Sequence, residues 1–228
     1  MSKRGLCSRS EAERLIRGGR VRVNGHVVRN PETPTTMAMA IDIDGQAATQ
    51  PVLRYLMLNK PRGLVTTVRD EQGRDTVYRC FDAANLGWIA PVGRLDKASE
   101  GVLLFSNDPA WAARITDPAS GPDKTYHVQV DCIPDAARLS ALHEGVRDGD
   151  EHLRAKSAVL LRTGEKNAWL EIVLDEGRNR QIRRLLAALK INVLRLVRVG
   201  IGSLALGDLP KGQWRELSAQ EVAALGGD

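Results

Sequence analysis

The chain has 228 residues, of which 43% are hydrophobic and 27% are charged, with a net charge of +5. No run approaches the roughly eighteen apolar residues of a membrane-spanning helix, and the charged start lacks the apolar centre of a secretory signal, so we expect a cytoplasmic protein without a membrane partner. Positive charge is concentrated in residues 1–30 and 176–198, each with a net charge of +6 against −7 for the rest, which indicates a polyanionic partner.

The first predicted element is a short helix, which begins with the capping box of Ser10 and Glu13 and ends at Gly18–Gly19. Its inward face is expected to be formed by Ala12, Leu15 and Ile16. Residues 20–23 then alternate as a strand does, and Asn24–Gly25 predicts a type I′ turn.

A returning strand at residues 27–28 and a closing strand at Ile41–Ile43 complete the predicted module. We assign residues 1–46 to this small basic module of helix and short strands. The polar, small residues 47–52 are then expected to form a linker.

The module resembles the alpha-L RNA-binding domain of the ribosomal protein S-four type. The resemblance rests on three stretches, which are Ser8–Glu13, Gly19–Gly25 and Ile43–Gly45. It implies that four arginines face RNA phosphates, to which a guanidinium donates in a planar fork: Arg9, Arg14, Arg20 and Arg22. Family members carry another helical turn or two before the equivalent of Gly5, so either the chain starts upstream or the first helix is short.

The second part, residues 53–228, mixes many strands with few helices and has no strict alternation of the two. Strands are predicted at residues 53–59, 102–105, 124–130, 157–162, 168–175 and 193–199. Helices are predicted from Pro134–Asp135 to Leu142, over residues 179–190, and after the cap Ser218. We therefore expect an α+β fold built on a largely antiparallel mixed sheet.

A glycine-framed loop at Gly93–Gly101 holds Arg94 and Asp96 just before the apolar strand at 102–105. Aspartate beside glycines is common in turns, so the loop alone favours a turn over a catalytic site. Loops anchored by buried strands are nevertheless where reactive side chains are often held. Whether this loop is a turn or a catalytic site therefore depends on features elsewhere in the chain.

Several kinds of chemistry lack their sequence motifs. There is no phosphate-binding Gly-x-x-x-x-Gly-Lys loop, no Gly-x-Ser-x-Gly elbow, no zinc-deaminase pattern and no dinucleotide fingerprint. Cys7, Cys80 and Cys132 are far apart and form no Cys-x-x-Cys pair, which favours reduced thiols over a disulfide framework or zinc site. We therefore expect a reaction that needs neither a metal nor another cofactor.

The second part is similar to the pseudouridine synthases that modify ribosomal RNA, in their RsuA-like branch. Five stretches carry the similarity, in the family's order and spacing: Leu58–Gly63, Gly93–Gly101, Lys124–Tyr126, Glu176–Arg184 and Leu196–Gly202. A module of the S-four type before such a domain is the usual architecture of this branch. The resemblance implies isomerisation of uridine to pseudouridine in ribosomal RNA, by a cytoplasmic enzyme that we expect to be a monomer.

The resemblance also implies roles for individual residues. Asp96 is the catalytic carboxylate, acting as nucleophile at C1′ or as base at C2′, and the sequence leaves both open. Tyr126 lies against the uracil and is a candidate to take the C5 proton. Arg183 pairs with Asp96, because a nearby guanidinium favours the ionised carboxyl. The remaining substrate contacts are expected from Arg94, Lys60, Ile182, Arg178 and Arg180.

Two other functions remain open from the residues. The chain could be a non-catalytic RNA-binding or ribosome-assembly factor that retains the fold, although Asp96, Tyr126 and Arg183 together favour catalysis. It could also be a glycosidase that releases a base, although no paired second carboxylate stands out. The modified uridine is not determined by the sequence, and residues 176–180 with Gly207–Leu209 lean only slightly toward large-subunit enzymes.

Overall fold

The computed structural model describes residues 1–68, 70–82 and 84–226. After a single 3₁₀ turn, η1 (Ser2–Arg4), helix α1 spans Arg9–Arg17. Ser8 is its N-cap and accepts a hydrogen bond of 3.0 Å from the backbone N–H of Glu11. The predicted cap at Ser10 was wrong, because Ser8 and Glu11 also have capping-box spacing and only Ser8 has the extended backbone that a cap requires.

A four-stranded antiparallel sheet follows, with the strand order β2-β1-β3-β4. Its strands are β1 (Val21–Val23), β2 (His26–Val28), β3 (Ile41–Ile43) and β4 (Gln46–Ala47). Asn24 and Gly25 have φ values of 48° and 82°, the two positive values of a type I′ turn. Leu15 of α1 packs on this sheet with Val21 and Ile41. Because β4 includes Ala47, the first sheet takes one residue of the predicted linker.

The large sheet has nine strands, and its main path is β11-β12-β8-β13-β7-β5-β15. Its strands are β5 (Tyr55–Lys60), β6 (Ala90–Val92), β7 (Glu100–Ser106), β8 (Lys124–Val130), β11 (Ser157–Thr163), β12 (Ala168–Leu174), β13 (Val193–Ile201), β14 (Leu204–Ala205) and β15 (Trp214–Glu216). Every pairing is antiparallel except the parallel pairing of β7 with β13. The predicted α+β fold on a largely antiparallel mixed sheet is confirmed.

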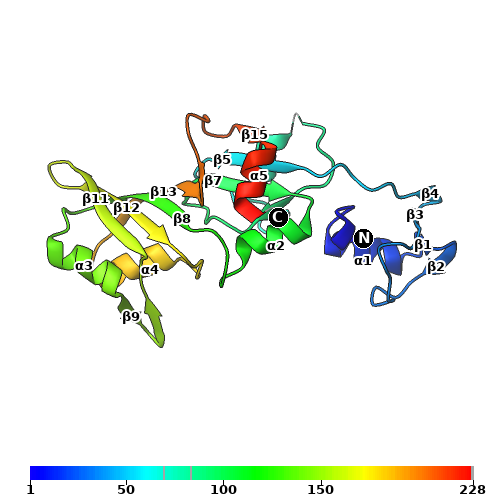
Figure 1. Ribbon diagram of the computed structural model, residues 1–228, viewed down its shortest axis with the longest axis horizontal. Coiled ribbons are helices and arrows are strands. Elements are labelled where there is room, and N and C mark those ends of the chain that lie inside the picture. The colour runs from blue at the N-terminus through cyan, green and yellow to red at the C-terminus, as the bar shows by residue number, and fades with distance from the viewer. Residues whose placement is uncertain (69, 83, 227–228) are drawn as a thin grey trace.

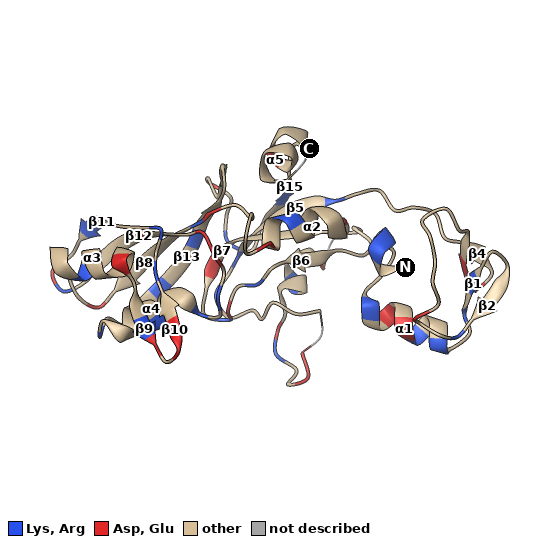
Figure 2. Cartoon of the chain, turned by 60° about the horizontal axis from the view of Figure 1, so that its bottom comes forward, with Lys and Arg blue, Asp and Glu red and all other residues tan. Residues whose placement is uncertain are grey.

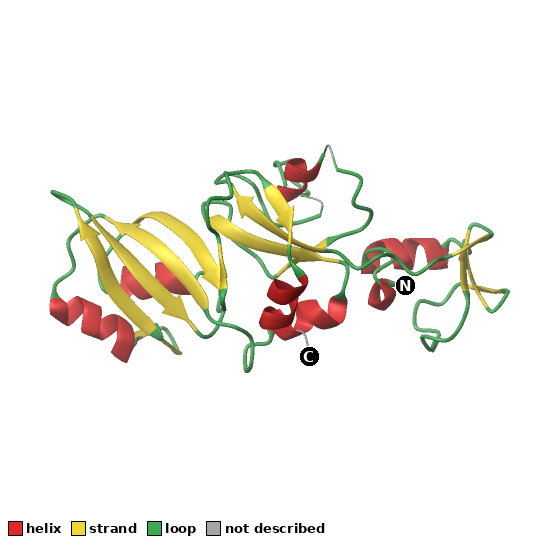
Figure 3. Ribbon diagram, turned by 45° about the horizontal axis from the view of Figure 1, so that its top comes forward, coloured by secondary structure: helices red, strands yellow, loops and turns green. Residues whose placement is uncertain are grey.

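The joint between β7 and β13 divides this sheet into two groups of strands (Figure 3). Only two residue pairs join them, Val197 with Glu100 and Arg198 with Gly101. Gly101 has a φ of 98°, and a Cβ there would lie 2.1 Å from the carbonyl oxygen of Arg198. The strands therefore approach too closely for any residue but glycine, and beyond this point they diverge.

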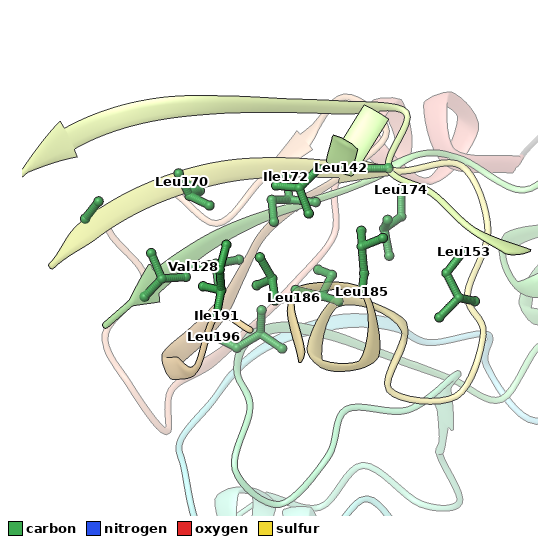
Figure 4. Packing of buried hydrophobic residues seen from close by; sticks show 14 residues of the cluster. Val128, Leu142, Leu153, Leu170, Ile172, Leu174, Leu185, Leu186, Ile191 and Leu196 are labelled. Atoms are coloured by element: carbon green, nitrogen blue, oxygen red, sulfur yellow. The ribbon is translucent and has the colours of Figure 1, made fainter. Parts of the chain in front are cut away.

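The first group, β11, β12, β8 and β13, is covered on one face by α3 (Ala136–Glu144) and α4 (Gln181–Ala188). A hairpin of β9 (Val146–Asp148) and β10 (Glu151–Leu153) adjoins these helices. Figure 4 shows Leu170 and Ile172 of the sheet facing Leu185 and Leu186 of α4. Helix α4 starts later than its predicted start at residue 179, because Arg180 is an N-cap in the left-handed conformation with a φ of 48°.

The second group, β7, β5 and β15, is covered on both faces. Helices α2 (Pro109–Thr116) and α5 (Ala219–Gly226) pack on Met57 and Leu104 of one face. The 3₁₀ helix η2 (Val77–Phe81) packs on the other face. Helix α2 was not predicted from the sequence, although an N-cap residue, Asp108, followed by Pro109 at the first helical position is typical of a helix start. None of the helices described is long and apolar enough to span a membrane.

Along its longest axis the molecule is extended, with the small amino-terminal sheet at one end and the first group of strands at the other (Figure 1). The turn η1 lies against α2, so the amino-terminal residues contact the second part directly. At this contact Gly5 approaches the carbonyl oxygen of Asn107 so closely that a Cβ would lie 2.3 Å away. A cavity at the joint of the large sheet is lined by residues of both groups of strands, among them Val92 and Leu174.

Candidate active site

The loop that carries Asp96 connects β6 to β7 at the joint of the large sheet. Gly93 enters it with a φ of 74° and Gly101 leaves it with a φ of 98°. Within the loop, the backbone N–H of Ser99 donates to the carbonyl oxygen of Asp96 at 3.0 Å. The Asp96 side chain is 31% exposed, so a rigid turn presents a carboxylate that a substrate can reach.

Lys60, at the end of β5, lies fully buried beneath this loop. Its Nζ donates to the carbonyl oxygens of Pro61, Asp96 and Ser99 at 3.1, 3.2 and 2.9 Å. Burial lowers the pKa of Lys60 to about 8, against the opposing influence of the Asp96 carboxylate. In this structure the Lys60 side chain holds the loop from below, and its expected contact with substrate stays a prediction.

A pocket of about 540 Å³ opens beside the loop, at the place where the two groups of strands diverge. It gathers Asp96, Tyr126 and Arg183 from segments that are far apart in the chain, and we call it the Asp96 pocket. The other predicted site residues that line it are Arg94, Arg178, Arg180 and Ile182. Seven of the residues singled out in the second part thus share one cavity.

The carboxylate of Asp96 forms its ion pair with Arg180, whose Nη1 lies 3.4 Å from Oδ2. The pairing with Arg183 that the resemblance implies is not formed. Arg183 instead donates from Nη2 to the carbonyl oxygen of Ala98 at 3.5 Å. The left-handed backbone of Arg180 at the start of α4 directs its side chain to the carboxylate, whereas Arg183, one turn later, reaches the backbone of the same loop.

Arg183 is partly buried, and its Nε has no hydrogen-bond partner in the structure. Burial lowers the pKa of Arg183, and the neighbouring Arg180 acts in the same direction while Asp96 opposes it. Both arginines therefore surround the loop of Asp96 with positive charge, at one wall of the pocket.

Tyr126 lines the pocket from β8, where it pairs in register with Arg198 of β13. It packs against the core of the first group of strands and against the η2 side of the second. Ile182 of α4 is 3% exposed and belongs to both the pocket wall and the core. Together they offer an aromatic ring and an aliphatic side chain to a flat ligand such as a nucleobase.

Arg94 and Arg178 extend the positive rim of the pocket. Arg94 is exposed and also lines a groove of about 410 Å³ on the other side of the loop, formed with residues 65–67, 70–72 and 74. Arg178 is engaged by Glu176 at 2.8 Å and by the carbonyl oxygen of His152 at 3.2 Å. Of the two, Arg94 is the one whose guanidinium has no ion pair within the described residues.

The four arginines predicted for RNA contact in the amino-terminal module lie outside the pocket. Figure 2 shows Lys and Arg on α1 and, at the other end of the molecule, around α4 and β13. Arg14 pairs with Glu11 and Arg20 with Asp44, both at 2.5 Å, while Arg22 donates to the carbonyl oxygen of Gly25. Arg9 is exposed and has no ion pair among the residues described.

Sequence reasoning assigned no role to two basic residues that line the pocket, Lys124 and Arg198. Both belong to stretches that carry the resemblance: Lys124 begins β8, and Arg198 of β13 pairs with Gly101 at the joint. The sequence motifs therefore contained both residues. Only the pairing of β13 with β8 and β7 shows that the two lie in the same part of the pocket. No group of three or more His, Cys, Asp or Glu side chains that could hold a metal occurs in residues 1–68, 70–82 and 84–226.

Comparison with known proteins gives a consistent picture over the whole chain. Residues 54–188 match the family model described as RNA pseudouridylate synthase, and residues 1–37 match the S4 domain. The chain is 36% identical over 232 residues to an uncharacterized RNA pseudouridine synthase of Aquifex aeolicus, covering 99% of this chain and 91% of that protein. It is 35% identical to the ribosomal large subunit pseudouridine synthase B of Bacillus subtilis, covering 97% and 91%.

A solved structure described as a pseudouridylate synthase superposes with a TM-score of 0.69 at 31% identity, covering 96% of this chain and 94% of that one. The similarity therefore includes the fold, the amino-terminal module and the order of the two parts.

Proposed function

Because the chain belongs to the RNA pseudouridylate synthase family, which isomerises uridine to pseudouridine in RNA, we propose that it modifies one uridine of large-subunit ribosomal RNA with Asp96 as its catalytic carboxylate. The single observation that supports this assignment best is the Asp96 pocket, in which a reachable carboxylate, an aromatic ring and several guanidinium groups converge. The large-subunit target follows the name of the Bacillus subtilis relative. This target also agrees with residues 176–180, whose sequence is slightly more similar to that of large-subunit enzymes.

The isomerisation breaks the N1–C1′ bond of uridine and forms a C5–C1′ bond, while a proton leaves C5 and one is gained at N1. The atoms of substrate and product are the same. Asp96 acts at the sugar, either by attacking C1′ and forming a glycosyl ester or by removing the proton at C2′. In both routes the Asp96 carboxylate acts with the Arg180 guanidinium 3.4 Å from its Oδ2.

The detached uracil has to rotate before C5 can meet C1′. Tyr126 and Ile182 bound the space in which the ring turns. Tyr126 is also the candidate to take the C5 proton. Lys60 and Arg183 hold the loop backbone, so that the carboxylate keeps its position while the base moves.

A uridine reaches this pocket only after it leaves its stack in the RNA, at a cost of a few kcal/mol. Arg94 stands at the rim, exposed, and is suited to hold a phosphate or to fill the vacated place in the RNA. Arg9 and its neighbours on α1 bind RNA phosphates at the other end of the elongated molecule, and Arg178 extends the contact beside the pocket. The active form is a cytoplasmic monomer.

The test is a map of pseudouridines in ribosomal RNA from a strain that lacks the protein. One pseudouridine of large-subunit RNA should disappear, return with the parent gene and stay absent with the Asp96→Asn gene. If no site is lost and the purified protein forms none in vitro, the assembly-factor function replaces this one. Release of free uracil from the RNA would instead identify a glycosidase.

A further inference from the structure

Arg198 is a buried cation that the proposed mechanism does not use. It lines the Asp96 pocket and is 6% exposed. Its Nε donates to the carbonyl oxygen of Val102 at 2.7 Å, just beyond the point where β7 and β13 stop pairing. Its Nη2 is buried and has no hydrogen-bond partner. A guanidinium fixed at one nitrogen thus keeps an unused donor, and such buried orphan donors are rare because each costs free energy.

Lys124 is a second cation in the same part of the pocket. It lies on β8, in register with Ile201, three residues along β13 from Arg198. It is partly buried and forms no ion pair or hydrogen bond from Nζ within the described residues. Burial lowers the pKa of Lys124, and the charge of Arg198 lowers it further. The adjacent Asp123 is engaged elsewhere, by Lys156 at 2.7 Å.

The carboxylates of the pocket do not balance these two charges. Asp96 pairs with Arg180, and Glu176 pairs with Arg178. Asp117 accepts from the hydroxyl of Ser120 at 2.7 Å. Asp123 and Asp175 oppose the lowering of the Lys124 pKa, but each pairs with another cation, Asp123 with Lys156 and Asp175 with Arg154. Lys124 and Arg198 thus have no ion pair of their own within the described residues, and an anion bound between them would stabilise both charges.

We propose that Lys124 and Arg198 form an anion subsite of the Asp96 pocket that holds a phosphate of the target nucleotide. The inference rests on the proposed function. Uracil and ribose are neutral, so the phosphodiester groups are the charged parts of a target uridine that two cations would select. A phosphate held here fixes the sugar while the glycosidic bond is open and the uracil turns, which a grip on the base alone could not do.

The test uses single-turnover pseudouridine formation in an RNA oligonucleotide that spans the mapped uridine and that the parent enzyme modifies. The ratio of maximal rate to half-saturating enzyme concentration is measured from low to high salt. Lys124→Met should lower this ratio about tenfold at low salt and flatten its logarithmic salt dependence by about one unit, as the loss of one phosphate contact does. Lys166→Met, in the hairpin loop between β11 and β12, is the matched control and should change neither.

Arg198→Lys keeps the positive charge, but a lysine cannot donate to the Val102 carbonyl oxygen and to the anion at the same time. This variant should therefore lower the ratio of maximal rate to half-saturating enzyme concentration several-fold without changing its salt dependence. If both residues hold one anion, the double variant loses less than the product of the single losses. Folding of each variant is checked by thermal unfolding.

An unchanged salt dependence in Lys124→Met, or independent losses in the double variant, would overturn the subsite while the parent's activity leaves the proposed function intact. A parent enzyme that forms no pseudouridine would instead refute the proposed function itself.

Discussion

Asp96 is held from two directions. Lys60 binds the backbone of its loop from below, through the carbonyl oxygens of Asp96 and Ser99, and Arg180 contacts the carboxylate from the side of α4. The backbone and the reactive group are therefore positioned by different elements. If Asp96 acts as proposed, such separate control keeps the carboxylate in place at the sugar while the base moves.

Replacing Asp96 separates chemistry from binding. Asp96→Asn keeps the size of the side chain but removes the nucleophile or base, so pseudouridine formation should fall about 1000-fold or more. RNA affinity should stay within about threefold, because the arginines and lysines supply most of the binding. Single-turnover assays and filter binding measure the two. A parallel loss of affinity would contradict this division of roles.

Lys60 gives a prediction about pH and stability. The pKa falls from 10.5 to about 8 on folding, so the unfolded chain binds this proton more tightly. Between about pH 8 and 10.5 the unfolded state carries a proton that the folded state has released, and the free energy of unfolding therefore rises with pH.

Lys60→Met lacks this group. The free energy of unfolding of the parent minus that of the variant should increase across the same interval, by about 3 kcal/mol in total. Denaturant unfolding at several pH values measures it, and the other titrating groups cancel in the difference. A difference that is constant or decreases with pH would refute the assignment.

At the scale of elements, the joint of β7 and β13 is the feature on which the site depends. Two residue pairs hold the two groups of strands together, and the pocket opens where they diverge. The Asp96 loop enters β7 at this joint, Tyr126 lies across from Arg198, and α4 brings Arg180 from the first group. A small change in the approach of the two strands would move all of these side chains relative to one another.

Gly101→Ala tests the joint. Its Cβ would lie 2.1 Å from the carbonyl oxygen of Arg198 at a φ of 98°, so the variant should lose about 3 kcal/mol of unfolding free energy and most activity. Gly177→Ala is the stability control, since a Cβ there meets nothing within 4 Å. Thermal unfolding compares the two. Equal stability of both variants would mean that the close approach is not needed.

At the scale of the whole molecule, positive charge lies at two separate places. Residues 1–30 and 176–198 each carry +6, and they lie on α1 and its surroundings and on α4 and β13 of an elongated molecule (Figure 2). An RNA that follows both places contacts the protein well beyond the pocket. We therefore expect the amino-terminal module to contribute mainly RNA affinity and placement, and the second part to contribute the chemistry.

Removing residues 1–47 should weaken RNA binding and reduce its logarithmic salt dependence by roughly 2 to 4 units, as several phosphate contacts are lost. The maximal single-turnover rate at saturating enzyme should change less than the affinity, because the Asp96 pocket lies in the second part. Binding titrations at several salt concentrations measure this. An unchanged salt dependence would show that α1 and its sheet do not engage phosphates.

The sequence by itself determined the local elements, including the glycine-framed loop that carries Asp96. The alternating strand at 124–130, the Asn24–Gly25 turn and the glycine-framed Asp96 depend on neighbouring residues, and all appear as expected. The similarity to the family could also be recognised from the sequence, because the motifs that carry it are short and continuous.

Only the tertiary structure decided which side chains meet. Arg180 rather than Arg183 contacts Asp96, across 84 residues of chain. Lys60 is buried because β5 ends beneath a loop from elsewhere, and Arg198 keeps an unpaired donor because β7 and β13 diverge there. Each outcome depends on the angle and distance between elements far apart in sequence, which local patterns do not encode.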